Sequence, residues 1–267
     1  SSAASDVYKR QKQYVEEYAG TQEVGELLKM TPGVYSTKEG GGVGDSRVYI
    51  RGFAQENITV MINGVPVNDM ENGRVYCSNC AGLTDGVSAL QVQRGLGSSP
   101  LPISSVGGTI NIVTKSTELT KGGKVGATVG SDGYLKSVLN YNTGIMDGGH
   151  ALSFVFSRTA GDGVVDFTEF EAFSYFLGYG WKSADDKNNV QFIVTGAPQY
   201  HQQRYYSYYN QGTLQQYIDH GIYYNYTGGM YDGQGFNMRR NFYHKPIASV
   251  NWAVSYTHLT LPTNREV

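Results

Sequence analysis

The chain contains no apolar run approaching the ~18 to 20 residues that a membrane-spanning helix needs, and this excludes a helical membrane protein. Neither sign of charge dominates, since 21 basic and 23 acidic residues give a formal net charge of −2. Without a positive excess no field would concentrate nucleic acid by counterion release, so we expect no nucleic-acid partner. Residues 1–6 lack the basic and apolar regions of a signal peptide, and we expect the natural N-terminus to be missing.

Cysteine is scarce, and the chemistry-bearing residues do not cluster. Cys77 and Cys80 are spaced C-x-x-C, which would suggest a redox dithiol or half of a zinc site if a second pair or histidines stood nearby. None does, and His201, His220 and His244 form no close i, i+4 pair. The sequence also shows no nucleophile with a base nearby and no paired carboxylates. We therefore expect no catalytic residue, no metal site, no cofactor and no enzyme.

Glycine and tyrosine are abundant, with 35 and 22 copies, and after Lys121 apolar and polar residues alternate with a period of two. In residues 173–181 one face carries Phe, Tyr, Leu, Tyr and Trp, and the other Ser, Phe, Gly and Gly. In residues 151–159 the same pattern places Leu152, Phe154 and Phe156 opposite Ser153, Val155 and Ser157. Such strands are expected where one side meets lipid and the other a wet lumen.

The connections between these strands also alternate. Residues 146–149 and 183–189 are short and turn-like, whereas 159–168 and 198–240 are long. Short turns at one end and long loops at the other are typical of an outer-membrane barrel. A water-soluble β-sandwich also alternates, but its solvated face should be charged, and the aromatic faces therefore favour the membrane.

The region before these strands reads as a separate small domain. A short helix is expected over residues 22–30, and short strands over 47–53, 58–67, 89–94 and 109–115. Asn63-Gly64 is the residue pair best able to take the positive φ angles of a tight hairpin turn. The loop that follows, 69–73, is expected at the tip of the domain.

Four short motifs stand in this region: Ile50–Phe53 (IRGF), Ile62–Pro66 (INGVP), Gln93–Gly95 (QRG) and Gly107–Ile112 (GGTINI). In this order and spacing they resemble the plug domain of TonB-dependent outer-membrane receptors. The style of the motifs is similar to that of receptors from Bacteroidetes-type bacteria. The resemblance also implies aromatic residues, often tryptophan, where this chain has Cys77 and Cys80. We interpret those cysteines as an incidental pair or a sequence error.

The resemblance and the alternation together predict a mainly β chain. A small α+β plug, at 21–117, is followed by the N-terminal part of an antiparallel transmembrane β-barrel, at 121–253, with a long external loop at about 198–240. A closed barrel of about 22 strands needs roughly 220 strand residues, but 147 residues follow Thr120. We therefore expect about six strands of an incomplete barrel, in a fragment of a longer protein.

The residue patterns at the two ends of the chain match neither the plug nor the alternating strands beside them. We expect a leader over 1–20 that is partly non-native, and a non-native tail over 254–267. The alternative for the tail is a seventh strand broken by Pro262.

The resemblance implies a function: active import of a scarce ligand across the cell outer membrane, with the plug gating the barrel. The implied partners are TonB with its inner-membrane energising complex, outer-membrane lipid, a surface lipoprotein, and a ligand such as a ferric chelate, a cobalamin, a sugar or a peptide. Two alternatives stay open, a passive porin or adhesin-like barrel and a soluble glycan-binding β domain.

Candidate site residues lie in two loops and on two plug strands. Tyrosine offers a flat apolar face and a hydroxyl at small entropic cost, which suits ligand capture, although the tyrosine-rich segment could also be an ordinary exposed loop. For ligand contact we expect Asn68, Asp69, Glu71, Asn72 and Arg74 from the tip loop, with Tyr205, Tyr206, Tyr208 and Tyr209 from the external loop. By resemblance Arg51 and Arg94 dock the plug against the barrel wall; the alternative is a solvated or locally paired arginine.

Overall fold

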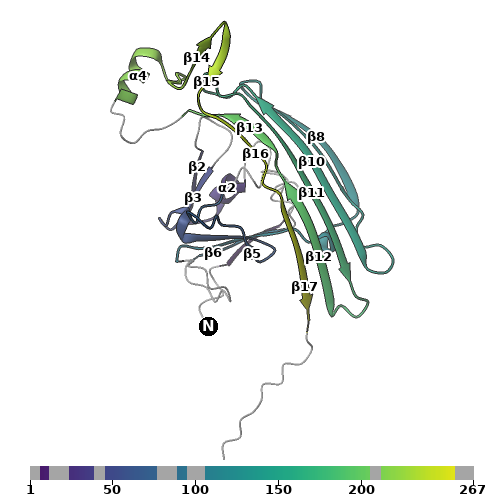
Figure 1. The fold of residues 1–267 in the computed structure, drawn as a ribbon. Coiled ribbons are helices and arrows are strands. Elements are labelled where there is room, and N and C mark those ends of the chain that lie inside the picture. The colour runs from purple at the N-terminus through teal and green to yellow at the C-terminus, as the bar shows by residue number, and fades with distance from the viewer. Residues whose placement is uncertain are drawn as a thin grey trace, which may run out of the picture.

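The computed structural model describes residues 7–11, 24–38, 46–76, 89–94, 106–204 and 212–255. These residues form a small N-terminal domain, up to Val113, and a tall antiparallel sheet, which we call the wall (Figure 1). The N-terminal domain lies against one face of the wall. No helix in this part of the chain is long and apolar enough to cross a membrane.

The N-terminal domain is built on a mixed sheet with strand order β1-β6-β7-β4-β5, in which β4 and β7 are parallel. Strands β2 and β3 form a separate hairpin beside helix α2. The elements in chain order are β1 (Val7–Gln11), α2 (Val24–Leu27), η2 (Leu28–Met30), β2 (Val34–Lys38), β3 (Ser46–Ile50), η3 (Gln55–Asn57), β4 (Ile58–Ile62), β5 (Val65–Pro66), β6 (Ala89–Arg94) and β7 (Gly108–Val113).

The wall follows η5 (Ser116–Glu118) and contains eight strands. Its members are β8 (Gly122–Val129), β9 (Leu135–Asn142), β10 (His150–Gly161), β11 (Phe170–Lys182), β12 (Asn188–Gly196), β13 (Gln199–Gln202), β16 (Arg240–Tyr243) and β17 (Ile247–Val254). Strands β12 and β13 pair with successive parts of β11, and β17 and β16 pair with β12 and β13 in turn. Strands β12 and β13 thus follow one line along the sheet, and β16 and β17 follow another. The eight strands therefore run across the wall six times, as the sequence predicts.

The two faces of the wall differ as the alternation predicts. On β10 the side chains of Leu152, Phe154 and Phe156 are exposed, whereas Ser153, Val155 and Ser157 are buried toward the N-terminal domain. On β11 Leu177 is 53 % exposed. No second sheet covers these apolar side chains within the described ranges, so their outward face is available to hydrocarbon.

The ends of the wall also differ. Short turns join β9 to β10 and β11 to β12 at one end, and the long connections lie at the other, where α4 (Gly212–His220), β14 (Gly228–Tyr231) and β15 (Gln234–Asn237) stand (Figure 1). The wall continues through Gln202, so part of the segment expected as external loop is strand. At the short-turn end Trp181 Nε1 donates to the Gly148 carbonyl at 3.2 Å and Trp252 Nε1 to Asn188 Oδ1 at 3.1 Å. Such tethered aromatics suit a membrane interface.

One apolar cluster joins the two parts of the molecule. It contains the sheet residues of the N-terminal domain, among them Ile62, Val92 and Ile112, together with the inward-facing wall residues Val155, Phe176 and Ile193. The N-terminal domain therefore completes its core on the wall.

Candidate functional site at the seam

The first and last of the four motifs meet in space. Arg51 and Gly52 have φ angles of 50° and 83°, and Ile50 and Phe53 exchange backbone hydrogen bonds of 3.1 and 2.9 Å across this tight turn. Phe53 then packs on Gly107, where an added Cβ would lie 2.7 Å from the Cβ of Phe53. Only glycine fits that approach. Residues 47–53 are thus not one continuous strand as expected, because β3 ends at Ile50.

The second motif is fastened to the segment that leads into the wall. Asn63 and Gly64 take φ angles of 50° and 84°, and the Asn63 N–H donates to the Ile112 carbonyl at 2.9 Å. The Asn63 side chain donates to Thr114 Oγ1 at 2.8 Å and accepts from the Thr114 N–H at 2.8 Å. This reciprocal pair fixes the β4–β5 turn beside the exit from the domain.

Ser116 and Thr117, which follow this segment, are buried and make polar contacts with the wall. Ser116 Oγ lies 2.5 Å from Ser153 Oγ on β10, and the Ser116 N–H donates to Gln191 Oε1 on β12 at 3.3 Å. Gln191 Nε2 donates to Thr117 Oγ1 at 3.0 Å. Space for this segment comes from Gly178 on β11, where an added Cβ would lie 2.4 Å from Ser116 Oγ.

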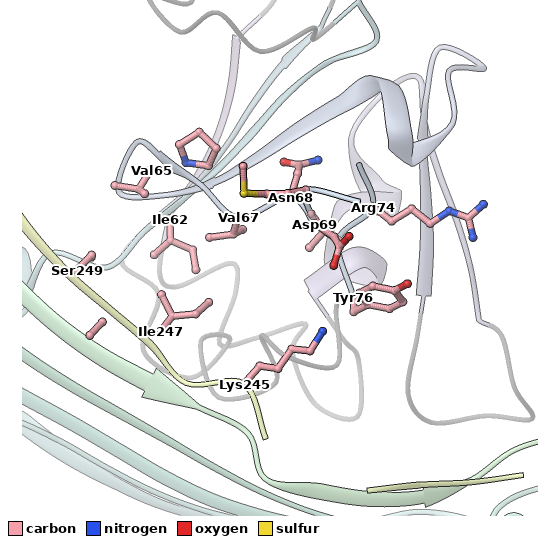
Figure 2. A pocket seen from close by; sticks show the side chains of 14 residues that line it. Ile62, Val65, Val67, Asn68, Asp69, Arg74, Tyr76, Lys245, Ile247 and Ser249 are labelled. Atoms are coloured by element: carbon pink, nitrogen blue, oxygen red, sulfur yellow. The ribbon is translucent and has the colours of Figure 1, made fainter. Parts of the chain in front are cut away.

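A cavity of about 390 Å³ lies between the N-terminal domain and the start of β17 (Figure 2). We call it the seam cavity. Figure 2 shows Val67 and Ile247 on opposite sides of it, and Lys245 extending toward Tyr76. Its lining residues are Ile62, Val65, Pro66, Val67, Asn68, Asp69, Met70, Arg74, Val75, Tyr76, Lys245, Ile247, Ala248 and Ser249.

The tip loop, residues 68–74, borders this cavity and is held by its own polar side chains. Asn68 Oδ1 accepts the Val60 N–H at 2.9 Å, and Asn68 Nδ2 donates to the carbonyls of Ile58 and Gly73, each at 2.8 Å. Asn68 thus acts as a substitute strand partner for β4. These bonds indicate a structural role for an amide that we expected to contact ligand.

The rest of the tip loop is a hydrogen-bonded turn. Asp69 Oδ1 accepts the N–H groups of Glu71 and Asn72 at 2.9 and 3.2 Å, and the Asn72 side chain donates to the Tyr76 hydroxyl at 3.1 Å. Arg74 Nε pairs with Glu56 Oε1 at 2.6 Å.

The carboxylate of Glu56 is tuned by its surroundings. A backbone hydrogen bond at Glu56 itself lowers its pKa most, and burial opposes that effect. The hydrogen bond and charge of Arg74, and the charge of Arg47, lower the pKa further. Glu56 therefore stays ionised, and able to hold Arg74, to a lower pH than an ordinary glutamate.

The residues predicted to contact ligand divide into three groups. Asn68, Asp69 and Arg74 line the seam cavity, while Glu71 and Asn72 lie in the same loop outside its lining. Tyr205, Tyr206, Tyr208 and Tyr209 fall outside the described residues, as do Cys77 and Cys80.

The two arginines expected to dock on the wall remain predictions. Arg51 lies in the turn after β3 and its side chain is exposed. Arg94 ends β6, where its backbone pairs with Gly108. Placing Arg51 on a strand was wrong.

Sequence reasoning missed Tyr76, Lys245, Ile247 and Ser249 as members of the cavity. Only the alternation of β17 gave a signal, since it places Ile247 and Ser249 on the inward face with Asn251. Among the described residues no group of three or more His, Cys, Asp or Glu side chains could hold a metal ion.

Residues 1–109 match the family model described as TonB-dependent Receptor Plug Domain. The vitamin B12 transporter BtuB of Vibrio vulnificus (strain CMCP6) is 27% identical over 124 residues, which are 46% of this chain and 20% of that protein. The BtuB of Photobacterium profundum is 32% identical over 112 residues, or 42% of this chain and 18% of that protein. The matches thus span about a fifth of these relatives' length.

Solved structures share the fold. The ferric citrate transporter FecA, in its unliganded form, superposes with a TM-score of 0.66 at 17% identity, covering 93% of this chain and 37% of that one. The ferric yersiniabactin uptake receptor FyuA from Yersinia pestis gives 0.60 at 20% identity, covering 75% and 33%. At these identities the likeness concerns the fold alone.

Proposed function

We propose that this chain, which belongs to the TonB-dependent receptors, takes part in active import of a scarce ligand across the outer membrane. Its N-terminal domain is the plug and its wall is part of the transmembrane β-barrel. The outward apolar face of β10 and β11 and the tryptophans at the short-turn end fit residence in the outer membrane.

The observation that carries the proposal is the packing of the plug across the inner face of the wall. The shared apolar cluster and the hydrogen bonds of Ser116 and Thr117 join the two parts. A lumen occupied by a folded domain is no passive pore, so passage needs work to displace or remodel that domain. This favours energised import over a passive porin or an adhesin-like barrel.

The ligand and the partners belong to the proposal as well. The curated relatives are vitamin B12 transporters and one solved neighbour is a ferric citrate transporter, which supports a cobalamin or a ferric chelate ahead of a sugar or a peptide. We place ligand contact at the tip loop with Glu71 and the tyrosines 205, 206, 208 and 209, and energy transfer at TonB and its inner-membrane complex. A surface lipoprotein is a further proposed partner. The relatives are transporters and receptors, and we propose no catalysis.

Two measurements on the full-length protein test this function. Reconstituted in liposomes, a plugged receptor should give no swelling in small sugars, whereas swelling at the rate of a general porin in a parallel sample would refute the plugged state. In cells, uptake of radiolabelled cyanocobalamin and ferric citrate should be compared with and without a functional TonB. Uptake that is unchanged without TonB would remove the import hypothesis.

A further inference from the structure

We propose that the seam cavity binds the apolar part of an amphiphilic anion, and that Lys245 recognises the negative charge of that ligand. The proposal deepens the import function, on which its biological role rests, by naming a ligand class for one site. The cavity, its unpaired cation and an unsatisfied hydroxyl carry it.

Most of the side chains that line the cavity are apolar. Ile62 and Val75 are buried, and Val67 and Ile247 pack partly buried against the core cluster. A volume of about 390 Å³ lies within the ~300 to 1,000 Å³ of pockets that take small molecules. Each sugar hydroxyl buried here without a partner would cost about 1 to 3 kcal/mol. The lining therefore favours an apolar group over a neutral sugar.

Lys245 supplies the charge at this cavity. Its Nζ lies 5.6 Å from the centroid of the Tyr76 ring, and within the described part of the chain it makes no ion pair. The other charged side chains of the lining are occupied, because Arg74 pairs with Glu56 and Asp69 accepts two N–H groups of its own loop. An incoming anion would give Lys245 the counter-ion that it lacks, over an aromatic face that already favours the ammonium.

A second polar group points to an acceptor on the ligand. Ser249 faces inward from β17 and lines the cavity, and its buried hydroxyl has no hydrogen-bond partner. Leaving a buried donor unpaired costs free energy. A carboxylate, sulfonate or phosphate ester carries acceptors for both Lys245 and Ser249, whereas a hydrocarbon carries none.

The test uses the full-length receptor with a thiol reporter in the cavity. Val65 lines the cavity and is 41 % exposed, so N-ethylmaleimide can reach a thiol placed there by Val65→Cys. Cys77, Cys80 and any further cysteine of the full-length receptor are replaced by serine, which leaves this thiol as the reporter. The reaction rate is measured with hexanoate, and with the neutral hexanamide of similar shape, at matched ionic strength. If Val65→Cys fails to fold, Met70→Cys serves as the reporter, because Met70 also lines the cavity and is exposed.

Hexanoate at twice its Kd should slow the labelling about threefold, because protection equals 1 + [L]/Kd for one site. Hexanamide should protect much less, and Lys245→Met should abolish the difference between the two probes. Lys187→Met, in the turn between β11 and β12, is the matched control and should retain it. Equal protection by both probes, no protection by hexanoate, or an effect that survives Lys245→Met would overturn the proposal. Since the assay involves neither TonB nor uptake, its failure would leave the import function standing.

Discussion

Replacing Gly178 by alanine should loosen the segment where the plug continues into the barrel wall. An added Cβ at this position would lie 2.4 Å from Ser116 Oγ and 2.7 Å from Ser153 Oγ, which are closer than real Cβ contacts. Those two hydroxyls bond each other at 2.5 Å, and both residues are buried. The methyl group must therefore displace at least one of them and break that bond.

The expected cost follows from these contacts. Separating two buried hydroxyls costs about 1 to 3 kcal/mol, and forcing a methyl group into a filled site costs about as much. A loss of about 2 kcal/mol in local stability corresponds to roughly thirtyfold faster opening, since 1.4 kcal/mol is a factor of ten. Hydrogen exchange of the backbone amides of residues 116–119, measured by mass spectrometry on the full-length receptor, should show this acceleration.

Two controls make the result decisive. Gly122→Ala adds the same methyl group where no atom lies within 4 Å, and it should leave the exchange unchanged. In a Ser116→Ala background the nearest clash is removed, so Gly178→Ala should add a smaller effect than it does alone. If Gly178→Ala exchanges like the unaltered protein at residues 116–119, the packing described for this segment is wrong.

Three further predictions concern the plug and the outer surface. Asn68→Ala removes three hydrogen bonds to the edge of β4 and the tip loop; it should cost about 1 to 3 kcal/mol, seen as faster exchange at the Val60 amide, and unchanged exchange there would contradict the structural role of Asn68. Phe154→Lys places a charge on the exposed face of β10 and should cost about 2 to 4 kcal/mol if that face meets the middle of the bilayer, measured by reversible folding of the full-length protein into lipid vesicles with Phe154→Leu as the control; a cost near zero would place this face outside the membrane. Because the pKa of Glu56 is lowered from its ordinary value of 4.5, its pairing with Arg74 stabilises the tip loop above that value and is lost as the pH falls through the lowered pKa. Exchange in residues 69–74, corrected for its intrinsic pH dependence, should therefore rise only below about pH 4.5, by at most the ~1 kcal/mol of an exposed pair, and Arg74→Met should remove the pH dependence.

The faces of the wall could be predicted from the sequence because burial in a strand is set locally. Each residue of β10 and β11 points to the side opposite its neighbours, so Leu152, Phe154 and Phe156 indicate their common face without any knowledge of the partner strands. The Asn63-Gly64 turn was predictable for the same reason, since the positive φ angles it needs favour these two residue types.

The contacts between the plug and the wall, and the seam cavity, could not be predicted, because they depend on residues far apart in the chain. Ser116 meets Gln191, and Tyr76 meets Lys245, only after the plug and the wall have packed together. The polar composition of residues 68–74 correctly indicated a loop, but composition does not distinguish side chains that hold a turn from side chains that await a ligand. Asn68 holds a turn. Arg51 lies in a tight turn and not in the expected strand, because the glycine after it permits the positive φ angle that this turn needs.

The apolar cluster shared by plug and wall has a consequence for the order of biogenesis. A plug released alone into the periplasm would lose Val155, Phe176 and Ile193 from the shared cluster and would expose the apolar surface that they cover. Such a surface invites capture by chaperones and by other unfinished chains. We therefore expect the plug and the wall to fold together, with the wall covering the apolar surface of the plug as it forms.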